Sequence, residues 1–596
     1  MRYNVDYKAV TPENAVAKVE DILARLGFLT DVKTFGKDGF AHSARLRLVN
    51  GKLSDLDIGT NGKGMNGSYA LASAYGELME RIENKMLLFT VKYASPDFVR
   101  NNPELSHLAS SGLKFRYFPD EKCVSLTEKE FCEWGRRMLP GSFLFEETSG
   151  RGNYDMTFLP FYSVSGAEVV NLPYDLIRLA AGSTGLCAGN TPQEALLQGL
   201  NEIFERYVLQ RIYLDDPILP SISQELFDYD EIGTRIARLK EATGWRVFVK
   251  DCSLGLGFPV LGLLIIDDAR GRYTFRLGAD IHPEIALQRC FTEIFQGTDI
   301  NESSFLPIDL LPDSSPADGF RQNLLNGRGQ FPCNIFIENE CVTEIWRDAP
   351  KVAGSIDGNF KSVMEWLKTR KYDIFVRDNS FLGFPAFHIY IPGLSDVDCR
   401  LYDVRNDIHP VPEHYRIKSE FRLRRLSESE VVSFVKKYEN TEEQTLMLYD
   451  YSSSPSNFIN KNLLLSMLSF RAARYGDAAR YMRDFLRIME RSGRRVPAYY
   501  RCVMDYFALL CKEMSSDAVH SVLSLLYTAS VAEDVISDME DRSTALANFP
   551  LPDCFNCEGC SCRGNCAYSD ILAIERRVQE LQFETPIDQS RLFALF

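Results

Sequence analysis

The stretch from Glu194 to Arg206 reads Glu-Ala-Leu-Leu-Gln-Gly-Leu-Asn-Glu-Ile-Phe-Glu-Arg. Thr191 and Pro192 just before it are cap and first-turn signals, and they predict a helix from about Thr191 to Leu214. A helix turns about 100° per residue, so four polar side chains fall on one face. These are Glu194, Gln198, Glu202 and Glu205. The apolar residues between them predict a well-packed helix with an acidic stripe set into it.

A second segment repeats part of this pattern. Glu77, Glu80 and Arg81 follow the same Glu, two apolar residues, Glu, Arg form as Glu202 to Arg206. The stretch from 68 to 90 has no helix breaker inside it. A helix there would place Glu77, Glu80 and Ser73 on one side. Either segment alone is compatible with a solvated acidic face that its arginine partly neutralises. Like charges at this spacing repel, so finding the pattern twice favours a site for hard cations such as magnesium, which bridges carboxylates to phosphates.

A third helix is predicted after Pro283 and runs through Phe295. Arg289 and Glu293 lie one turn apart on it, and as a lone pair they could simply bridge each other. Beside the other two helices they indicate a cation that contacts phosphate and one more carboxylate.

Glycines before the first of these helices need separate treatment. Gly62 to Gly67 matches G-x-G-x-x-G, but the preceding strand, Ser54 to Ile58, is weak, and no acidic strand end follows at the required distance. The pattern therefore favours a glycine-rich turn with backbone N–H groups at a helix N-terminus over a dinucleotide fold. No G-x-x-x-x-G-K-[ST] loop occurs in the sequence.

The three helices resemble the ATP-binding motifs of the YcaO family. The family pattern S-x-x-x-E-x-x-E-R matches Ser73, Glu77, Glu80 and Arg81. The pattern E-x-x-x-Q-x-x-x-E-x-x-E-R matches Glu194, Gln198, Glu202, Glu205 and Arg206 without a gap, and R-x-x-x-E matches Arg289 and Glu293. The resemblance implies an ATP fold without a Walker loop.

In that family, glutamates hold magnesium ions on the phosphates of ATP, and polar or basic residues contact phosphate. The resemblance therefore implies a magnesium set of Glu77, Glu80, Glu194, Glu202 and Glu205. It implies a nucleotide set of Lys8, Ser73, Arg81, Gln198, Arg206, Arg289 and Glu293, in which Lys8 lies ahead of the first helix of the chain. No catalytic residue is named by the sequence.

Characterised members of the family phosphorylate a peptide amide oxygen, after which a nucleophile displaces phosphate to give an azoline, an amidine or a thioamide. The chain resembles long bacterial members linked to β-methylthiolation of a small-subunit ribosomal protein, as accessory factors to a radical methylthiotransferase. The resemblance thus implies a peptide or ribosomal protein substrate and that enzyme as partner. Azoline-forming members often end in a proline-rich tail, whereas this chain has no proline after Pro586. A non-catalytic adaptor is the alternative from another functional class.

Bulk properties are those of a cytoplasmic globular protein. The chain has 596 residues and a net charge of −15, which disfavours broad binding to nucleic acid. Its most apolar runs, such as Pro259 to Ile266, are too short to span a bilayer. We expect no signal peptide and no membrane association.

Alternating β-rich runs and helices predict an α+β fold. Strands are expected at Ala44 to Val49, Trp245 to Lys250, Pro259 to Ile266, Tyr273 to Leu277, Asp373 to Val376 and Phe387 to Tyr390, and a helix at 12 to 26, capped by Thr11 and ended by Gly27. The ATP-binding region is predicted to span residues 1–440, with an N-terminal subdomain of about 1–100.

A helical region is predicted from 441 to 545, after a Ser/Pro-rich linker at Ser452 to Ser456. Paired helices around Tyr475-Gly476-Asp477, predicted to be a turn, indicate a tetratricopeptide-like module. One such unit cannot bury its apolar face alone, so we expect it to form a homodimer or to dock a partner.

The last region, 546–596, is a cysteine-rich tail with a terminal helix. Five of the fifteen cysteines crowd into it: Cys554, Cys557, Cys560, Cys562 and Cys566. Two overlapping C-x-x-C units in a reducing compartment predict a zinc or an iron–sulfur site. The sequence does not separate these two alternatives.

Overall fold

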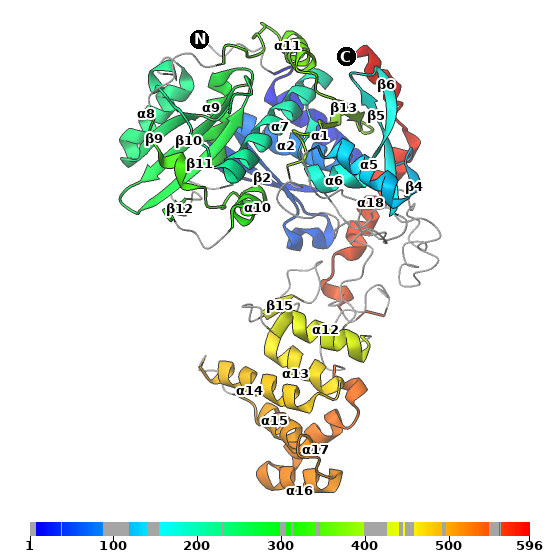
Figure 1. Cartoon of the computed structure of the whole chain (residues 1–596). Helices are drawn as coiled ribbons and strands as arrows, with labels where there is room; N and C mark the ends of the chain where they lie inside the picture. The colour runs from blue at the N-terminus through cyan, green and yellow to red at the C-terminus, as the bar shows by residue number, and fades with distance from the viewer. Residues whose placement is uncertain are drawn as a thin grey trace.

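The computed structural model describes residues 8–36, 39–87, 118–140, 154–227, 230–297, 305–310, 315–339, 346–397, 423, 426–439, 445–447, 458–491, 496–546, 559–560 and 562–596. Figure 1 shows an α+β body, with a group of helices extending from it and α18 (Tyr568–Glu584) leading back to it. The predicted α+β class is confirmed, because every strand pairing in the described sheets is antiparallel and helices cover the sheets.

The N-terminal part of the body is a three-stranded sheet covered by two helices. Thr11 caps α1 (Pro12–Leu26) and left-handed Gly27 ends it, as predicted. The strands β1 (Thr30–Phe35), β2 (His42–Leu48) and β3 (Gly59–Gly64) pair in chain order, with the 3₁₀ helix η2 (Gly51–Leu56) between the last two. Helix α2 (Gly67–Glu83) follows, and the Asn66 side chain caps it by accepting from the Tyr69 N–H at 3.0 Å.

A five-stranded sheet lies on one side of the body, at the left of Figure 1. Its order is β12-β11-β10-β9-β8, and α9 packs on β10 and β11. The predicted strands and the helix after Pro283 are confirmed. The bounds are β8 (Ser221–Ile222), η5 (Gln224–Phe227), α8 (Glu231–Thr243), β9 (Arg246–Asp251), β10 (Val260–Asp267), β11 (Arg272–Ala279), α9 (Pro283–Ile294), β12 (Leu306–Pro307), α10 (Pro316–Asn326) and η7 (Cys333–Phe336).

A six-stranded sheet lies on the other side, in the order β4-β5-β13-β14-β7 with β6 paired to β5. Strands β13 and β14 confirm the two later strand predictions, and β4, β5 and β6 were not predicted. The bounds are β4 (Lys122–Leu126), α5 (Glu128–Met138), β5 (Tyr154–Ser163), β6 (Glu168–Pro173), α6 (Tyr174–Ala181), β7 (Leu186–Ala188), α11 (Ile356–Thr369), β13 (Phe375–Asp378) and β14 (Ala386–Tyr390).

Helix α7 (Pro192–Asp215) runs between these two sheets and carries the predicted acidic stripe. Its apolar residues belong to one core with side chains from β10, β11, β14 and α11. The prediction of a well-packed helix with an acidic stripe is confirmed.

The helices that extend from the body share a second core of their own. They are α12 (Glu428–Glu439), α13 (Lys461–Arg471), α14 (Tyr475–Arg491), α15 (Ala498–Leu510), α16 (Ser516–Leu526), α17 (Ala529–Met539) and η12 (Arg542–Thr544), with the strand pair β15 (Thr445–Met447) and β16 (Phe458–Asn460). The predicted turn is misplaced: the helix–turn–helix bend falls at 472–474, and Tyr475-Gly476-Asp477 form the first turn of α14. The tetratricopeptide-like character remains a prediction, and the linker at 452–456 lies outside the described residues.

After η13 (Arg563–Asn565), the chain packs on the body. Helix α18 contacts η2 and α1, and η14 (Gln589–Ala594) lies along β5, β6 and β13. Within the described ranges, none of the helices is both long and apolar enough to cross a membrane.

Candidate functional site

The candidate site is built where α2 and α9 pack on β3, with α7 beside α9. A Cβ on Gly62 of β3 would lie 2.3 Å from the Ala74 nitrogen of α2. The Thr60 hydroxyl donates to the Ala74 carbonyl at 2.7 Å. Beyond the end of α9, the Gln296 side chain donates to the Asn61 carbonyl at 2.7 Å. Strand β3 therefore connects the helix of the second glutamate pattern to the helix of the Arg-Glu pair.

This packing explains the glycines and overturns one prediction. Gly62 and Gly64 lie in strand β3, antiparallel to β2, and most of Ser54 to Ile58 is the 3₁₀ helix η2. A dinucleotide fold requires a parallel βαβ unit, so that alternative is excluded. The predicted phosphate-binding turn is also wrong for Gly62 and Gly64, because they are strand residues that allow close approach to α2.

On α2, Arg81 lies close to both glutamates. The Arg81 guanidinium lies 3.4 Å from Glu77 and 3.8 Å from Glu80. The Glu80 side chain is 14% exposed and the Glu77 side chain is 33% exposed. Both side chains are therefore accessible from the surface, although protein surrounds most of each. Ser73, one turn earlier, is exposed.

On α7, the stripe divides into two ends. At the first turn, buried Glu194 accepts from the Lys8 ammonium at 3.2 Å, the Ala9 N–H at 3.0 Å and the Asn190 side chain at 2.9 Å. The structure thus brings together Lys8 and Glu194, which were assigned to the site on separate grounds. Towards the other end, Glu202 lies 3.8 Å from Arg206.

Helix α9 faces the middle of the stripe. The Arg289 guanidinium donates to the Gln198 side chain at 2.7 Å. Glu293 forms an ion pair with Lys63 of β3, so it has a partner outside its own helix.

Lys63 is a site residue that the motif analysis did not single out. It lies on β3 with its side chain towards α9, and its charge interacts with those of Glu205, Arg289 and Arg206. Its direction follows from alternation along β3 once the pairing with β2 shows that this segment is a strand: Gly62 and Gly64 face α2, so Lys63 between them points to the other side.

The charges of the site act on one another. Burial raises the pKa of Glu80 well above its usual range, and the neighbouring charges of Glu202 and Glu77 raise it further, against the opposing effect of Arg81. Burial also raises the pKa of Glu202, which Arg206 and Arg81 oppose. Burial lowers the pKa of Lys63 to about 8. Side chains of α2, α7, α9 and β3 therefore form one electrostatic unit.

This donor set fits a divalent cation with phosphate. Glu202 of α7 is close enough to raise the pKa of Glu80 of α2, and a bound cation would relieve that repulsion. Arginines and a lysine surround them, as a polyphosphate requires. In addition, the buried Asn190 side-chain oxygen beside Glu194 has no hydrogen-bond partner among the described residues.

As placed, these side chains are held by ion pairs and do not converge on one point. Within the part of the chain that the structure describes, no group of three or more His, Cys, Asp or Glu side chains is arranged to hold a metal. That finding also applies to Cys560, Cys562 and Cys566, while Cys554 and Cys557 lie outside the described residues. The fit to magnesium therefore rests on the chemistry of the donors and not on a preformed cage.

A pocket opens beside the first half of α7. Polar and apolar side chains share its lining, which comprises Lys8, Glu194, Leu197, Gln198, Asn201, Asp280, Ile281, Ile356 and Asn359. The Asn201 side chain donates to Asp280 at 3.0 Å, so part of the polar wall is fixed. The pocket is continuous with the predicted site through Glu194 and Gln198.

Comparisons with known proteins identify the family of this chain. A protein-family model described as YcaO cyclodehydratase, ATP- and Mg²⁺-binding, matches residues 61–395. The Escherichia coli protein named ribosomal protein S12 methylthiotransferase accessory factor YcaO is 30% identical over 359 residues, which is 57% of each chain. An uncharacterized protein of Haemophilus influenzae is 26% identical over 404 residues, 65% of each chain. The alignments thus span less than two thirds of either relative.

Two solved structures show a partial likeness. A heterocyclase in complex with substrate and cofactor has a TM-score of 0.45 and 18% identity, covering 68% of this chain and 56% of that one. YcaO from Methanopyrus kandleri, bound with AMPPCP and Mg²⁺, has a TM-score of 0.42 and 15% identity, covering 68% and 96%. The family model itself covers more than half of the 596 residues and includes all three motif helices. This chain belongs to the YcaO family.

Proposed function

We propose that this protein uses ATP and Mg²⁺ to phosphorylate a backbone amide oxygen of a peptide or protein substrate. The observation that carries the proposal is the electrostatic unit formed by the carboxylates of α2 and α7 with the basic side chains of α9 and β3. An amide is a poor electrophile, and its oxygen becomes a good leaving group once it carries phosphate.

The chemistry balances without an external oxidant. The amide oxygen attacks the γ-phosphorus, the bond to the bridging oxygen breaks, and ADP leaves. A nucleophile then adds to the activated carbon, and inorganic phosphate departs with the former amide oxygen. Magnesium would neutralise phosphate charge, held by Glu77, Glu80, Glu202 and Glu205.

The protein's own groups would orient the nucleotide. Arg289, which donates to Gln198, and Lys63, which pairs with Glu293, would contact phosphate oxygens from the α9 side. Arg81 and Arg206 limit the repulsion between carboxylates until the cation arrives. Lys8 and Glu194 border the pocket beside α7, whose mixed polar and apolar wall suits the nucleoside end.

The name of the Escherichia coli relative directs the proposal to a substrate. We infer a small-subunit ribosomal protein as substrate and a radical methylthiotransferase as partner, with the activated amide or the ATP-bound state supporting β-methylthiolation. Azoline or thioamide formation on another peptide is the alternative within the same chemistry.

Isothermal titration calorimetry tests the nucleotide assignment. The native protein should bind ATP only in the presence of Mg²⁺, and Glu205→Gln should weaken binding strongly. Glu231→Gln on α8, which removes a carboxylate from a surface pair with Arg235, is the matched control and should bind normally. Equal affinity in Glu205→Gln and native protein would remove the site assignment.

A non-catalytic adaptor is the second candidate, because helices α12 to α17 form a core separate from the ATP-binding body. Complementation of cells that lack the gene separates the two. Loss of function in Glu202→Gln supports the ATP-using enzyme, whereas full complementation supports the adaptor. Dimerisation through the helical region and a cytoplasmic location belong to both proposals.

The metal prediction for the cysteine-rich segment stands as a separate proposal. Cys562 is buried and Cys560 and Cys566 are partly buried next to the core of the helical region. Elemental analysis of protein purified without oxygen decides it: zinc near one per chain indicates a structural site, and iron with acid-labile sulfide indicates a cluster. Five freely reactive thiols and no metal would reject both.

A further inference from the structure

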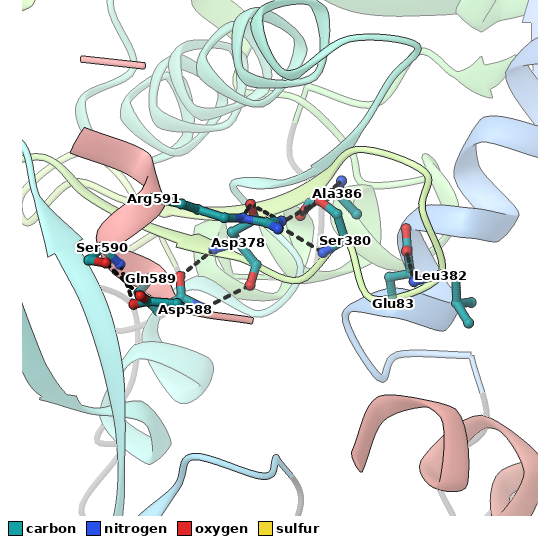
Figure 2. Close-up of polar contacts among 9 residues, drawn as sticks. All are labelled: Glu83, Asp378, Ser380, Leu382, Ala386, Asp588, Gln589, Ser590 and Arg591. Atoms are coloured by element: carbon teal, nitrogen blue, oxygen red, sulfur yellow. Dashed lines mark hydrogen bonds and ion pairs between the residues drawn. The ribbon is translucent and has the colours of Figure 1, made fainter. Parts of the chain in front are cut away.

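The last residues of the chain are fixed to the turn between β13 and β14. The side-chain amide of Gln589, 3% exposed, accepts from the Asp378 N–H at 2.8 Å and donates to the Asp378 carbonyl at 2.9 Å. The Arg591 guanidinium donates through Nε to the Asp378 carboxylate at 2.8 Å (Figure 2). The final residue, Phe596, stacks on Tyr162 with ring centroids 5.8 Å apart. The C-terminal segment, residues 585–596, is thus held at several points.

Asp378 connects the C-terminal segment to the turn between β13 and β14. Its other carboxylate oxygen accepts from the Ser380 N–H at 2.9 Å and from the Ser380 hydroxyl at 2.6 Å. The Ser380 hydroxyl in turn accepts from the Ala386 N–H at 3.0 Å (Figure 2). Because Asp378 is 4% exposed, its charge depends on Arg591 and these donors for compensation. Both ends of the turn are therefore closed by one buried carboxylate.

The same turn holds the C-terminal end of α2. The Leu382 N–H donates to the Glu83 carboxylate at 2.9 Å (Figure 2). The Asn379 side chain donates to the Asn84 side chain at 2.8 Å. Glu83 is fully buried and lies one helical turn after Glu80. Thr585, at the start of the C-terminal segment, donates to the Phe381 carbonyl at 3.2 Å. Polar contacts at both ends of the turn, joined by its backbone, thus connect Arg591 to the helix that carries Glu77 and Glu80.

We propose that the C-terminal segment positions the carboxylates of α2 for Mg²⁺–ATP, acting through Asp378, the β13–β14 turn and Glu83. The proposal rests on the proposed function for its ligand. Arg591, Asp378 and Glu83 belong neither to the proposed magnesium set nor to the proposed nucleotide set, so they would act as positioning residues. Leu592 of the segment shares an apolar core with α7, but the polar contacts that start at Arg591 end on α2, so the effect of Arg591 should be larger in the α2 half of the site.

The test compares Arg591→Ala with Arg591→Lys and with Arg577→Ala in the full-length protein. Arg577 belongs to an exposed surface pair on α18 and controls for the loss of a cation near the C-terminus. Arg591→Ala should weaken Mg²⁺-dependent ATP binding about three- to tenfold. Arg591→Lys, which keeps the charge on Asp378, should restore part of that loss, and Arg577→Ala should bind as the native protein does.

Hydrogen exchange supplies a readout that does not depend on nucleotide. Amides at 77–83 of α2 should exchange faster in Arg591→Ala, while those at 202–206 of α7 should not change. Unchanged exchange in α2 overturns the proposal, and so does faster exchange with native ATP affinity. If the native protein binds no Mg²⁺–ATP, the proposed function fails by itself, and the exchange experiment still decides whether the segment braces α2.

Discussion

Helices α2 and α7 carry the same Glu-x-x-Glu-Arg pattern, yet the molecule holds them in different ways. Helix α7 lies between the two sheets and has polar anchors along its length: Asn201 donates to Asp280, Gln210 to the Val397 carbonyl and Tyr213 to the Gly329 carbonyl. Helix α2 packs on β3 through glycines and is tied at its end to a turn that the C-terminal segment secures. The two helices therefore share a sequence motif, but different contacts hold each of them in place.

The charges around the two motifs also differ. Glu202 is opposed by Arg206, Arg81 and Arg289, whereas Arg81 is the cation that opposes the rise in the pKa of Glu80. Fewer positive charges therefore offset the repulsion at Glu80 of α2 than at Glu202 of α7 before any cation binds. We infer that α7 is the rigid half of the site and α2 is the half whose placement depends on distant contacts.

The largest expected effect comes from the glycines that seat each helix. A Cβ at Gly62 would meet backbone atoms of α2, whereas a Cβ at Gly199 of α7 would lie 2.9 Å from the side chains of Cys187 and Ile389. Side chains can move and helix backbone cannot, so Gly62→Ala should lower the free energy of unfolding by about 3 kcal/mol. Gly199→Ala should stay within about 1 kcal/mol, because a gain in helix propensity offsets the crowding. Denaturation midpoints measured by circular dichroism check this, and equal losses would refute the contrast.

Sequence patterns reveal the α7 stripe and the three motif helices because both depend on local spacing. Arg591 and Asp378 are far apart in the sequence and belong to no motif, so nothing in either segment predicts their contact. Lys63 is hidden for a different reason: its neighbours are glycines that suggest a loop, and only the pairing of β2 with β3 shows that they form a strand. The turn at Tyr475 is misplaced because Gly476 is tolerated in a first helical turn.

Neutralising one carboxylate on each helix gives the next effect. Glu80→Gln and Glu202→Gln should each weaken Mg²⁺–ATP binding about ten- to hundredfold in calorimetry, as expected for groups that contact or support a bound metal. In the absence of nucleotide, Glu80→Gln should raise the melting temperature by about 2 °C, because a buried, repelled charge is removed. Glu202→Gln should raise it less, since three arginines already compensate Glu202. The reverse order of melting temperatures would contradict the charge comparison.

The charge of Lys63 should make both the stability of the protein and its affinity for ATP depend on pH. Its folded-state pKa of about 8 lies below the unfolded value, so as the pH rises the folded protein loses the Lys63 proton before the unfolded protein does. Stability contributed by Lys63 therefore rises with pH between about 8 and 10.4. Contact with phosphate requires the charged form, so ATP affinity should fall by at most about tenfold per pH unit above pH 8. Calorimetry at pH 7 and 9 should show this fall in the native protein and a smaller one in Lys63→Arg, whose charge persists. A fall of equal size in both would exclude Lys63 as its source.

The smallest effect on the site is expected from the helices that extend from the body. Because α12 to α17 have a core of their own, replacing residues 426–546 with a flexible linker should leave Mg²⁺–ATP affinity within about twofold of the native value. The same deletion should abolish dimerisation or partner docking, as light scattering and co-purification would show.

Ending the chain near residue 450 is a different experiment, because it also removes α18 and η14 from the body. That shorter chain should lose at least as much affinity as Arg591→Ala, through the α2 half of the site. If the two deletions have equal affinities, the support of α2 does not come from the C-terminal segment, and the contrast with α7 loses its structural basis.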